Sequence, residues 1–238
     1  AVIEEAARLG KEGQVREGGA HDFALYLLTE FRATEALPAI LELLSLQEPM
    51  LDYLLRGTLT ELTHRMLAVL AADQPDLIES LLASPHLNEY VRWEAGQALV
   101  QLVVDGRISR GGALERLTRQ LRAAVQARDV WGTTIAVNEL GDLNPLELQD
   151  EIKAAFDAEL VDETMIGWKY FADHLFYPQQ PGDCPELVRH KPSEMSDTVE
   201  EMRGWYCFSE EAQEERERWE AQEAQRTADA GEWGDALF

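Results

Sequence analysis

Two histidines and two cysteines in the C-terminal third of the chain are the side chains best suited to hold a metal ion. His174, Cys184, His190 and Cys207 would supply the nitrogen and sulfur ligands that zinc prefers. Successive members of this set stand ten, six and seventeen positions apart, whereas zinc sites usually contain two closely spaced pairs. The spacing therefore predicts an aromatic-rich patch with two incidental thiols and no metal site.

Catalytic groups do not stand out from the sequence either. Carboxylates are so frequent that no acid–base pair is distinguished, and adjacent glutamates such as Glu4 and Glu5 are expected to face solvent. The chain contains no Gly-x-Ser-x-Gly motif and no EF-hand loop. Its glycine-rich stretch, residues 10–19, lacks the Gly-Lys-Ser/Thr ending of a phosphate-binding loop. We therefore predict no catalytic residue and no cofactor.

The densest aromatic segment is Gly204-Trp205-Tyr206-Cys207-Phe208. Two interpretations stay open. Trp205, Tyr206 and Phe208 either pin the C-terminal segment onto the rest of the fold or form an exposed anchor for a partner, since aromatic side chains dominate binding hot spots.

The elements that position these side chains are predicted to be helices, because apolar residues recur with helical periodicity. In one example, Val91, Ala95, Ala98, Leu99 and Leu102 lie on one face of a helix. The same pattern predicts helices at residues 34–46, 50–56, 60–72, 75–82, 88–104, 109–125, 130–140, 148–160 and 209–226. No segment alternates apolar and polar residues over a useful length, so no strand is expected.

Short links that contain proline, aspartate or asparagine separate these helices, which favours antiparallel helix pairs. The pairs recur at an irregular spacing of about 35 to 50 residues, which is typical of α-solenoids. A four-helix bundle is the competing fold. About ten short helices in series exceed one bundle, so the solenoid is preferred.

Three regions follow from these patterns. Residues 1–20 form a helical or flexible lead, residues 21–176 a helical repeat domain, and residues 177–238 an acidic C-terminal extension. Residues 193–238 alone hold 14 acidic and 4 basic side chains. The extension is expected to pack back with one long helix and to end in a mobile tail at residues 231–238.

Composition restricts the class of partner. The 238 residues include 45 acidic and 21 basic side chains, giving a formal net charge of −24, which disfavours nucleic acid and anionic membranes as partners. No apolar run approaches the roughly 20 residues of a membrane span. Two cysteines and the lack of a signal-peptide pattern predict a reducing, cytoplasmic location.

The segment Asn88-Glu-Tyr-Val-Arg92-Trp-Glu-Ala95-Gly-Gln-Ala98-Leu99 resembles the second helix of a HEAT repeat. In that pattern Asn88 caps the helix and Arg92 reaches carboxylates or carbonyl groups of the adjacent repeat. Residues 20–175 more broadly resemble an uncharacterised bacterial family, a domain of unknown function with HEAT-like repeats. Its members often end in a SEC-C zinc tail, but this chain has no Cys-x-Cys motif. The resemblance implies a fold and no activity.

The sequence thus predicts an all-α, HEAT-like α-solenoid with an acidic C-terminal extension. The expected function is a non-catalytic scaffold that binds a basic protein through a solenoid surface. Two alternatives stay open: an enzyme or accessory of the HEAT-like lyase type, by fold analogy alone, and an acidic mimic of nucleic acid. The oligomeric state is not predicted.

Overall fold

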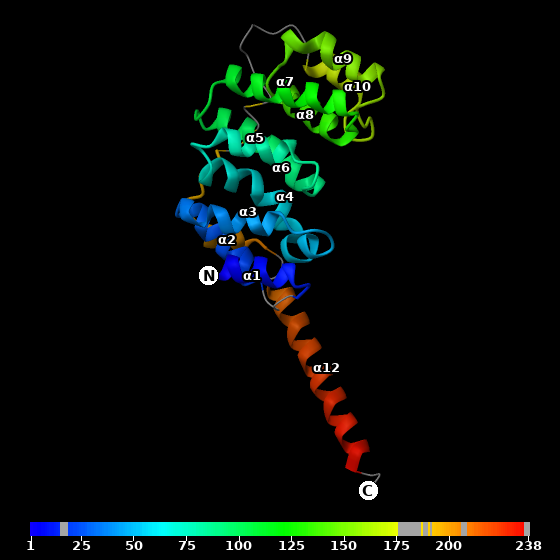
Figure 1. Cartoon of the computed structure of the whole chain (residues 1–238). Coiled ribbons are helices and arrows are strands. Elements are labelled where there is room, and N and C mark those ends of the chain that lie inside the picture. The colour runs from blue at the N-terminus through cyan, green and yellow to red at the C-terminus, as the bar shows by residue number, and fades with distance from the viewer. Residues whose placement is uncertain (15–18, 176–186, 188–189, 191, 206–208, 236–238) are drawn as a thin grey trace. The chain divides into compact units, whose positions relative to one another are not determined.

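The computed structural model describes residues 1–14, 19–175, 187, 190, 192–205 and 209–235, and every regular element in these ranges is a helix (Figure 1). The expected all-α class is therefore confirmed for the described residues. The chain divides into two compact units, Ala1–Met195 and Ser196–Phe238.

Eight helices form the body of the first unit. They are α1 (Val2–Lys11), α2 (Ala20–Glu30), α3 (Leu37–Leu44), α4 (Met50–Leu70), α5 (Pro75–Ala83), α6 (Glu89–Val104), α7 (Arg110–Ala127) and α8 (Val130–Asp142). A single turn (η2, Leu146–Leu148), α9 (Gln149–Asp157), the short α10 (Trp168–Tyr170) and a π-helical turn (η3, Phe171–Leu175) follow.

Side-chain caps set the starts of α6, α7 and α8. Asn88, Ser109 and Asp129 stand at the N-cap positions of α6, α7 and α8, and each side-chain oxygen accepts a hydrogen bond from a backbone N–H of the first turn. Such caps satisfy amide groups that would otherwise lack a partner. Local sequence therefore decides where these helices begin.

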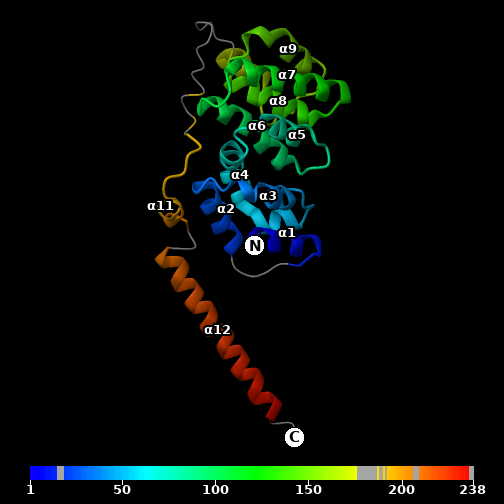
Figure 2. The same ribbon diagram turned by 60° about the vertical axis from the view of Figure 1, so that its left-hand side comes forward.

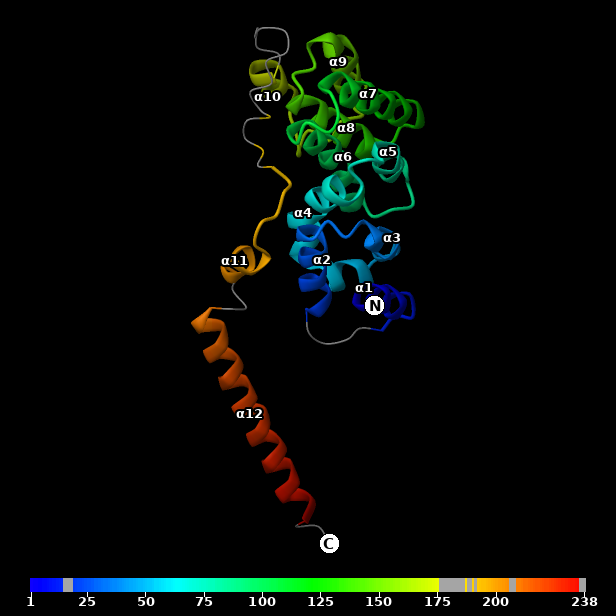
Figure 3. The ribbon, with the colours of Figure 1, turned by 90° about the vertical axis from the view of Figure 1, so that its left-hand side faces the viewer.

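The helices of the first unit lie in two layers. We call α2, α4, α6 and α8 the even layer, because each contacts the next along the chain. The odd layer contains α1, α3, α5 and α7, in which α1 contacts α3 and α5 contacts α7. Each odd helix also packs against the even helix that follows it. Figure 3 shows the even layer on the left of this unit and the odd layer on the right.

Small residues let the helices of the even layer approach one another. Ala95 and Ala98 of α6 are fully buried. A Cβ atom on Gly96 would lie 2.9 Å from Cγ2 of Ile135 and 3.0 Å from Cγ of Glu139 on α8. A larger residue at position 96 would therefore push α6 and α8 apart.

Helix α4 is interrupted at Arg56, where the sequence prediction of separate helices at 50–56 and 60–72 ends its first helix. It is one element with a break at Arg56, whose backbone adopts φ 41° and ψ −125°. Positive φ is rare for residues other than glycine, and this one residue redirects the chain. The two expected segments therefore join without a loop.

Residues 190 and 192–195, which we call the strap, lie beside the even layer (Figure 2) and contact the C-terminal ends of its helices. His190 Nε2 is 3.0 Å from Oδ2 of Asp142, the last residue of α8. The backbone N–H of Ser193 donates to Oδ1 of Asp105, the C-cap of α6, at 3.1 Å. Arg32, just beyond α2, donates to Glu194 at 2.5 Å. The strap therefore joins three helix ends that are distant in sequence.

The second unit contains α11 (Thr198–Arg203) and α12 (Glu210–Asp235). Helix α12 extends beyond the expected segment 209–226 and includes residues 231–235, which the sequence assigned to a mobile tail. Alanine and glutamate, both good helix formers, dominate this region, and no proline interrupts it. No helix of the described residues is both long and apolar enough to cross a membrane.

Candidate functional site

A buried guanidinium joins three helices at the centre of the first unit. Arg92 of α6 is buried. Its Nε donates to the carbonyl oxygen of Leu82 in α5 at 3.1 Å, and its Nη2 donates to Oδ2 of Asp129 at 2.6 Å. We call this arrangement the Arg92 bridge. It holds the end of α5, the first half of α6 and the start of α8 in one geometry.

Asp129 serves two helices at once. Its Oδ1 accepts a hydrogen bond from the backbone N–H of Gly132 at 2.9 Å, which caps α8, while Oδ2 binds Arg92. Burial by itself would raise the pKa of Asp129, but the hydrogen bonds from Gly132 and Arg92 outweigh burial and lower that pKa. The carboxylate is therefore held in its charged form.

Asn88 connects α6 to the loop before α4. Its Oδ1 accepts from the backbone N–H of Tyr90 at 2.8 Å, and its Nδ2 donates to Oε1 of Glu48 at 2.7 Å. Asn88 and Arg92, both named from the sequence, thus each contact a residue of a neighbouring helix pair.

Three aromatic rings lie where α6 and α8 begin, and they were not identified as a group from the sequence. The ring centroid of Trp131 lies 5.6 Å from that of Trp93 and 6.4 Å from that of Tyr90, with interplanar angles of 56° and 75°. We call Tyr90, Trp93 and Trp131 the aromatic cluster. The i, i+3 spacing of Tyr90 and Trp93 was the available signal, but their meeting with Trp131 depends on helix packing.

A cavity of about 350 Å³ lies on the other side of the Arg92 bridge. Leu82 of α5 and Ala123, Ala124 and Ala127 of α7 supply apolar walls. Arg92, Asp129 and Gln120 supply the polar ones. The cavity is lined by few polar groups and several short alanine side chains. Such a lining is suited to non-covalent binding of a ligand or side chain.

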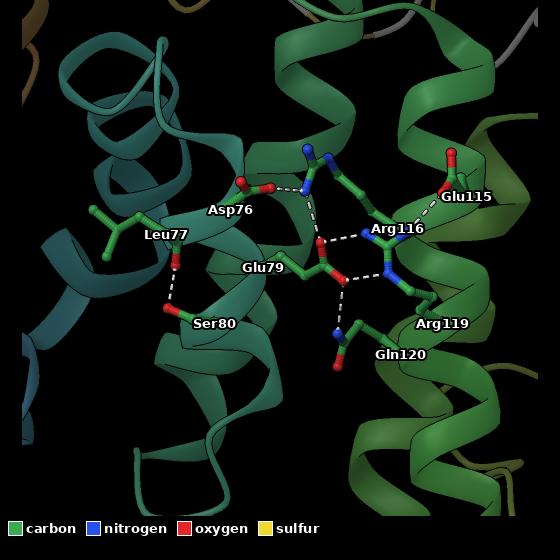
Figure 4. Close-up of polar contacts among 8 residues, drawn as sticks. All are labelled: Asp76, Leu77, Glu79, Ser80, Glu115, Arg116, Arg119 and Gln120. Atoms are coloured by element: carbon green, nitrogen blue, oxygen red, sulfur yellow. Dashed lines mark hydrogen bonds and ion pairs between the residues drawn. The ribbon is translucent and has the colours of Figure 1, made fainter.

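Ion pairs link α5 to α7 (Figure 4). Glu79 accepts hydrogen bonds from Nη1 of Arg116 at 2.7 Å, Nη2 of Arg119 at 2.8 Å and Nε2 of Gln120 at 3.0 Å. Arg116 also binds Asp76 at 2.5 Å. We call these five residues the Glu79 cluster. Burial would raise the pKa of Glu79, yet the donors from Arg119, Gln120 and Arg116 lower it.

Two further glutamates lie inside the even layer. Glu94 of α6 accepts from the backbone N–H of His64 at 3.2 Å and lies 2.8 Å from its Nδ1. Glu139 of α8 is fully buried; Asn138 donates to its Oε1 at 3.0 Å, and its Oε2 has no hydrogen-bond partner among the described residues. Burial, and then the charges of Asp142 and Glu94, raise the pKa of Glu139 well above its usual value. Burial likewise raises the pKa of Glu94.

The remaining residues named from the sequence lie in the C-terminal part. Trp205 follows α11 and is half-buried. Tyr206, Phe208, Cys184 and Cys207 lie outside the described residues, so neither interpretation of the aromatic segment is tested. In the ranges that the structure describes, no group of three or more His, Cys, Asp or Glu side chains is arranged to hold a metal ion.

Comparison with known proteins assigns the chain to a family. The family described as "Protein of unknown function (DUF1186)" matches residues 15–209, so the chain belongs to it. This agrees with the expected resemblance to an uncharacterised bacterial family.

Two relatives come from Chlamydia. An uncharacterised protein of Chlamydia muridarum (strain MoPn / Nigg) is 32% identical over 185 residues, which cover 78% of this chain and 74% of the relative. An uncharacterised protein of Chlamydia trachomatis serovar D is 31% identical over 185 residues, which cover 78% and 73%. No solved structure matches the chain.

Proposed function

We propose that this protein is an α-solenoid of HEAT-like helix pairs that acts as a non-catalytic scaffold for a basic protein. A recurring sequence distance supports the repeat. The Arg92–Asp129 contact joins residues 37 positions apart, the Asn88–Glu48 contact 40, the Arg119–Glu79 contact 40 and the Trp131–Glu89 contact 42. Contacts between successive pairs at about 40 residues agree with the HEAT repeat length.

The distribution of charge supports a basic partner. At least ten of the described basic side chains are already held by carboxylates of the same chain. Helix α7 is the clearest case, because Arg116 and Arg119 bind carboxylates of α5 while Arg122 binds Glu151 of α9. The acidic excess is therefore the charge that a partner would meet, and it would steer a basic protein toward this surface.

The even layer is the proposed binding surface. Each of its helices carries a large, exposed apolar side chain near its N-terminal end: Phe23 on α2, Tyr53 on α4, Tyr90 on α6 and Val130 on α8. Among the described residues of the odd layer, α3, α5 and α7 carry no such side chain, and α1 carries only Val2. Exposed aromatic anchors on a polar surface are typical of binding sites. The exposed Phe23, Tyr53 and Tyr90 on successive helices of the even layer are the observation that carries the proposal.

Capture of partners by the tagged full chain tests the proposal. The bait is incubated with lysate of the source organism, washed at low and then at high salt, and the bound proteins are identified by mass. A basic protein that binds stoichiometrically and leaves at high salt is the expected result, because salt screens charge-steered contacts. Equal retention of every bound protein at both salt concentrations would contradict it.

A pair of charge-reversal variants locates the surface. One replaces Asp52, Glu61 and Glu89 of the even layer by lysine, and the matched control replaces Glu35, Glu159 and Glu163, which are equally exposed and lie outside that layer. Both variants change the net charge by the same amount. The first should lose the partner and the second should retain it, whereas equal loss would show that only the net charge matters.

A further inference from the structure

The aromatic cluster is held in place before any partner arrives. The indole Nε1 of Trp131 donates to the backbone carbonyl oxygen of Glu89 at 3.1 Å, which fixes this ring against α6. The Arg92 bridge holds the starts of α6 and α8 together. Tyr90 is 47% exposed, and Trp93 and Trp131 are half-buried, so the three rings offer an aromatic surface that is partly open to solvent.

Two carboxylates belong to residues that adjoin the cluster along the chain or through one hydrogen bond. Glu89 immediately precedes Tyr90, and Glu48 accepts the hydrogen bond from Asn88. Both are exposed, and neither forms an ion pair among the described residues, in contrast to Glu79 and Glu151 of the odd-layer side. The partial positive charge at the start of α6 would disfavour a cation, but Glu89 lies in the first turn and offsets it.

Elsewhere in the described structure, aromatic rings bind cations of the same chain. The guanidinium of Arg56 lies 5.2 Å from the ring centroid of Tyr53, and the ammonium of Lys153 lies 5.3 Å from that of Trp168. Among the described residues no lysine or arginine lies over Tyr90, Trp93 or Trp131. The aromatic cluster can therefore form the same cation–π contact with a cation that belongs to another molecule.

We propose that the aromatic cluster, with Glu48 and Glu89 at its rim, binds an arginine side chain of the basic partner. A planar guanidinium stacks on an aromatic face while its N–H groups donate to carboxylate oxygens, and an ammonium group stacks less well. The cluster thereby provides a specific anchor on the even layer. The inference rests on the scaffold function proposed above and names the side chain that the scaffold recognises.

Titration of the full chain with three capped tripeptides tests this site. The probes are triarginine, trilysine and tricitrulline, of which citrulline keeps the shape of arginine without its charge. Binding is followed by NMR of the indole N–H signals of Trp93 and Trp131. Triarginine should shift both signals and bind more tightly than trilysine, and tricitrulline should not bind. Equal shifts with tricitrulline would overturn the proposal.

Matched variants separate the cluster from general charge attraction. Tyr90→Ala should weaken triarginine binding about threefold to tenfold. Tyr170→Ala is the control, because Tyr170 is 45% exposed and lies outside the cluster. Glu89→Gln should weaken binding, whereas Glu163→Gln should not. Because Tyr90 is exposed, its replacement should leave the melting temperature near that of the wild type. Equal affinities of Tyr90→Ala and Tyr170→Ala for triarginine would overturn the inference.

Partner capture distinguishes failure of this inference from failure of the scaffold function. If Tyr90→Ala retains the salt-sensitive partner at the wild-type level, the arginine site is wrong and the scaffold stands. If the wild-type chain captures no salt-sensitive basic protein, the scaffold function is wrong.

Discussion

At the scale of single residues, removal of the Arg92 side chain should weaken the junction of α5, α6 and α8. Arg92→Ala leaves the carbonyl of Leu82 and one oxygen of Asp129 without their donor at a buried junction. Loss of such charge-assisted bonds should lower the free energy of unfolding by about 2–3 kcal/mol. Urea unfolding of the variant checks this value. Arg107→Ala is the control, since Arg107 is exposed, and equal losses in the two variants would show that the bridge is dispensable.

Glu139 gives a second prediction, which concerns pH. Its pKa is raised in the folded state, so the folded chain binds more protons than the unfolded chain at pH values between the ordinary 4.5 and the raised value. Stability should therefore fall as pH rises through this window. Glu139→Gln carries no charge and should flatten the slope. Urea unfolding from about pH 5 to about pH 8 measures it, with the exposed Glu163→Gln as control. An unchanged slope in Glu139→Gln would contradict the assignment.

These two residues also show what the sequence reveals about the site. Asn88 and Arg92 were identifiable because the contiguous segment from Asn88 to Leu99 resembles the second helix of a HEAT repeat. Glu139 gave no such signal, because its burial depends on the close approach of α6 at Gly96, more than forty positions earlier. The aromatic cluster was missed for the same reason, since Trp131 meets Tyr90 and Trp93 only after α6 and α8 have packed.

At the scale of elements, the Glu79 cluster should stabilise the packing of α5 against α7. Glu79→Gln removes the charge that Arg116 and Arg119 share, and we expect a loss of about 1–2 kcal/mol in the free energy of unfolding. Thermal or urea unfolding measures this loss. Glu115→Gln should change stability by less than about 0.5 kcal/mol, because Glu115 is exposed and pairs only within α7.

The same cluster predicts behaviour in acid. The pKa of Glu79 is lowered in the folded state, so its contribution is present above the ordinary pKa and is lost as pH falls through the lowered one. The stability difference between wild type and Glu79→Gln should therefore shrink in acid. A difference that stays constant down to about pH 2 would show that the carboxylate charge is not the cause.

Elements were predictable where the signal was local. Periodicity placed α3 and α5 to α8, and capping residues set several starts within a residue or two. For α4 the sequence showed an interruption of the helical pattern after residue 56 but not its cause. A single residue with positive φ does not alter the periodicity of the apolar residues. The strap could not be predicted in this way, because its sequence shows no hydrophobic periodicity. Its contacts reach partners 48, 88 and 162 positions away.

At the scale of the whole first unit, the strap complements a packing in which helices mainly contact their neighbours along the chain. Such layers unfold piecewise, because no contact ties one end to the other. The strap, residues 190 and 192–195, supplies that tie: Ser193 and Met195 are buried, and the strap contacts the ends of α8, α6 and α2. It should therefore couple the unfolding of distant helices.

Asp105→Ala tests this coupling, because Asp105 accepts hydrogen bonds from both the backbone N–H and the hydroxyl of Ser193. We expect the urea transition to broaden, with a smaller m-value, as α1 and α2 unfold separately from α6 and α8. Hydrogen exchange should show faster exchange in α2 than in α6. Glu163→Gln is the control, since Glu163 is exposed and lies outside the strap and its contacts. A lower midpoint with an unchanged m-value and uniform exchange would mean that the strap adds stability without coupling the helices.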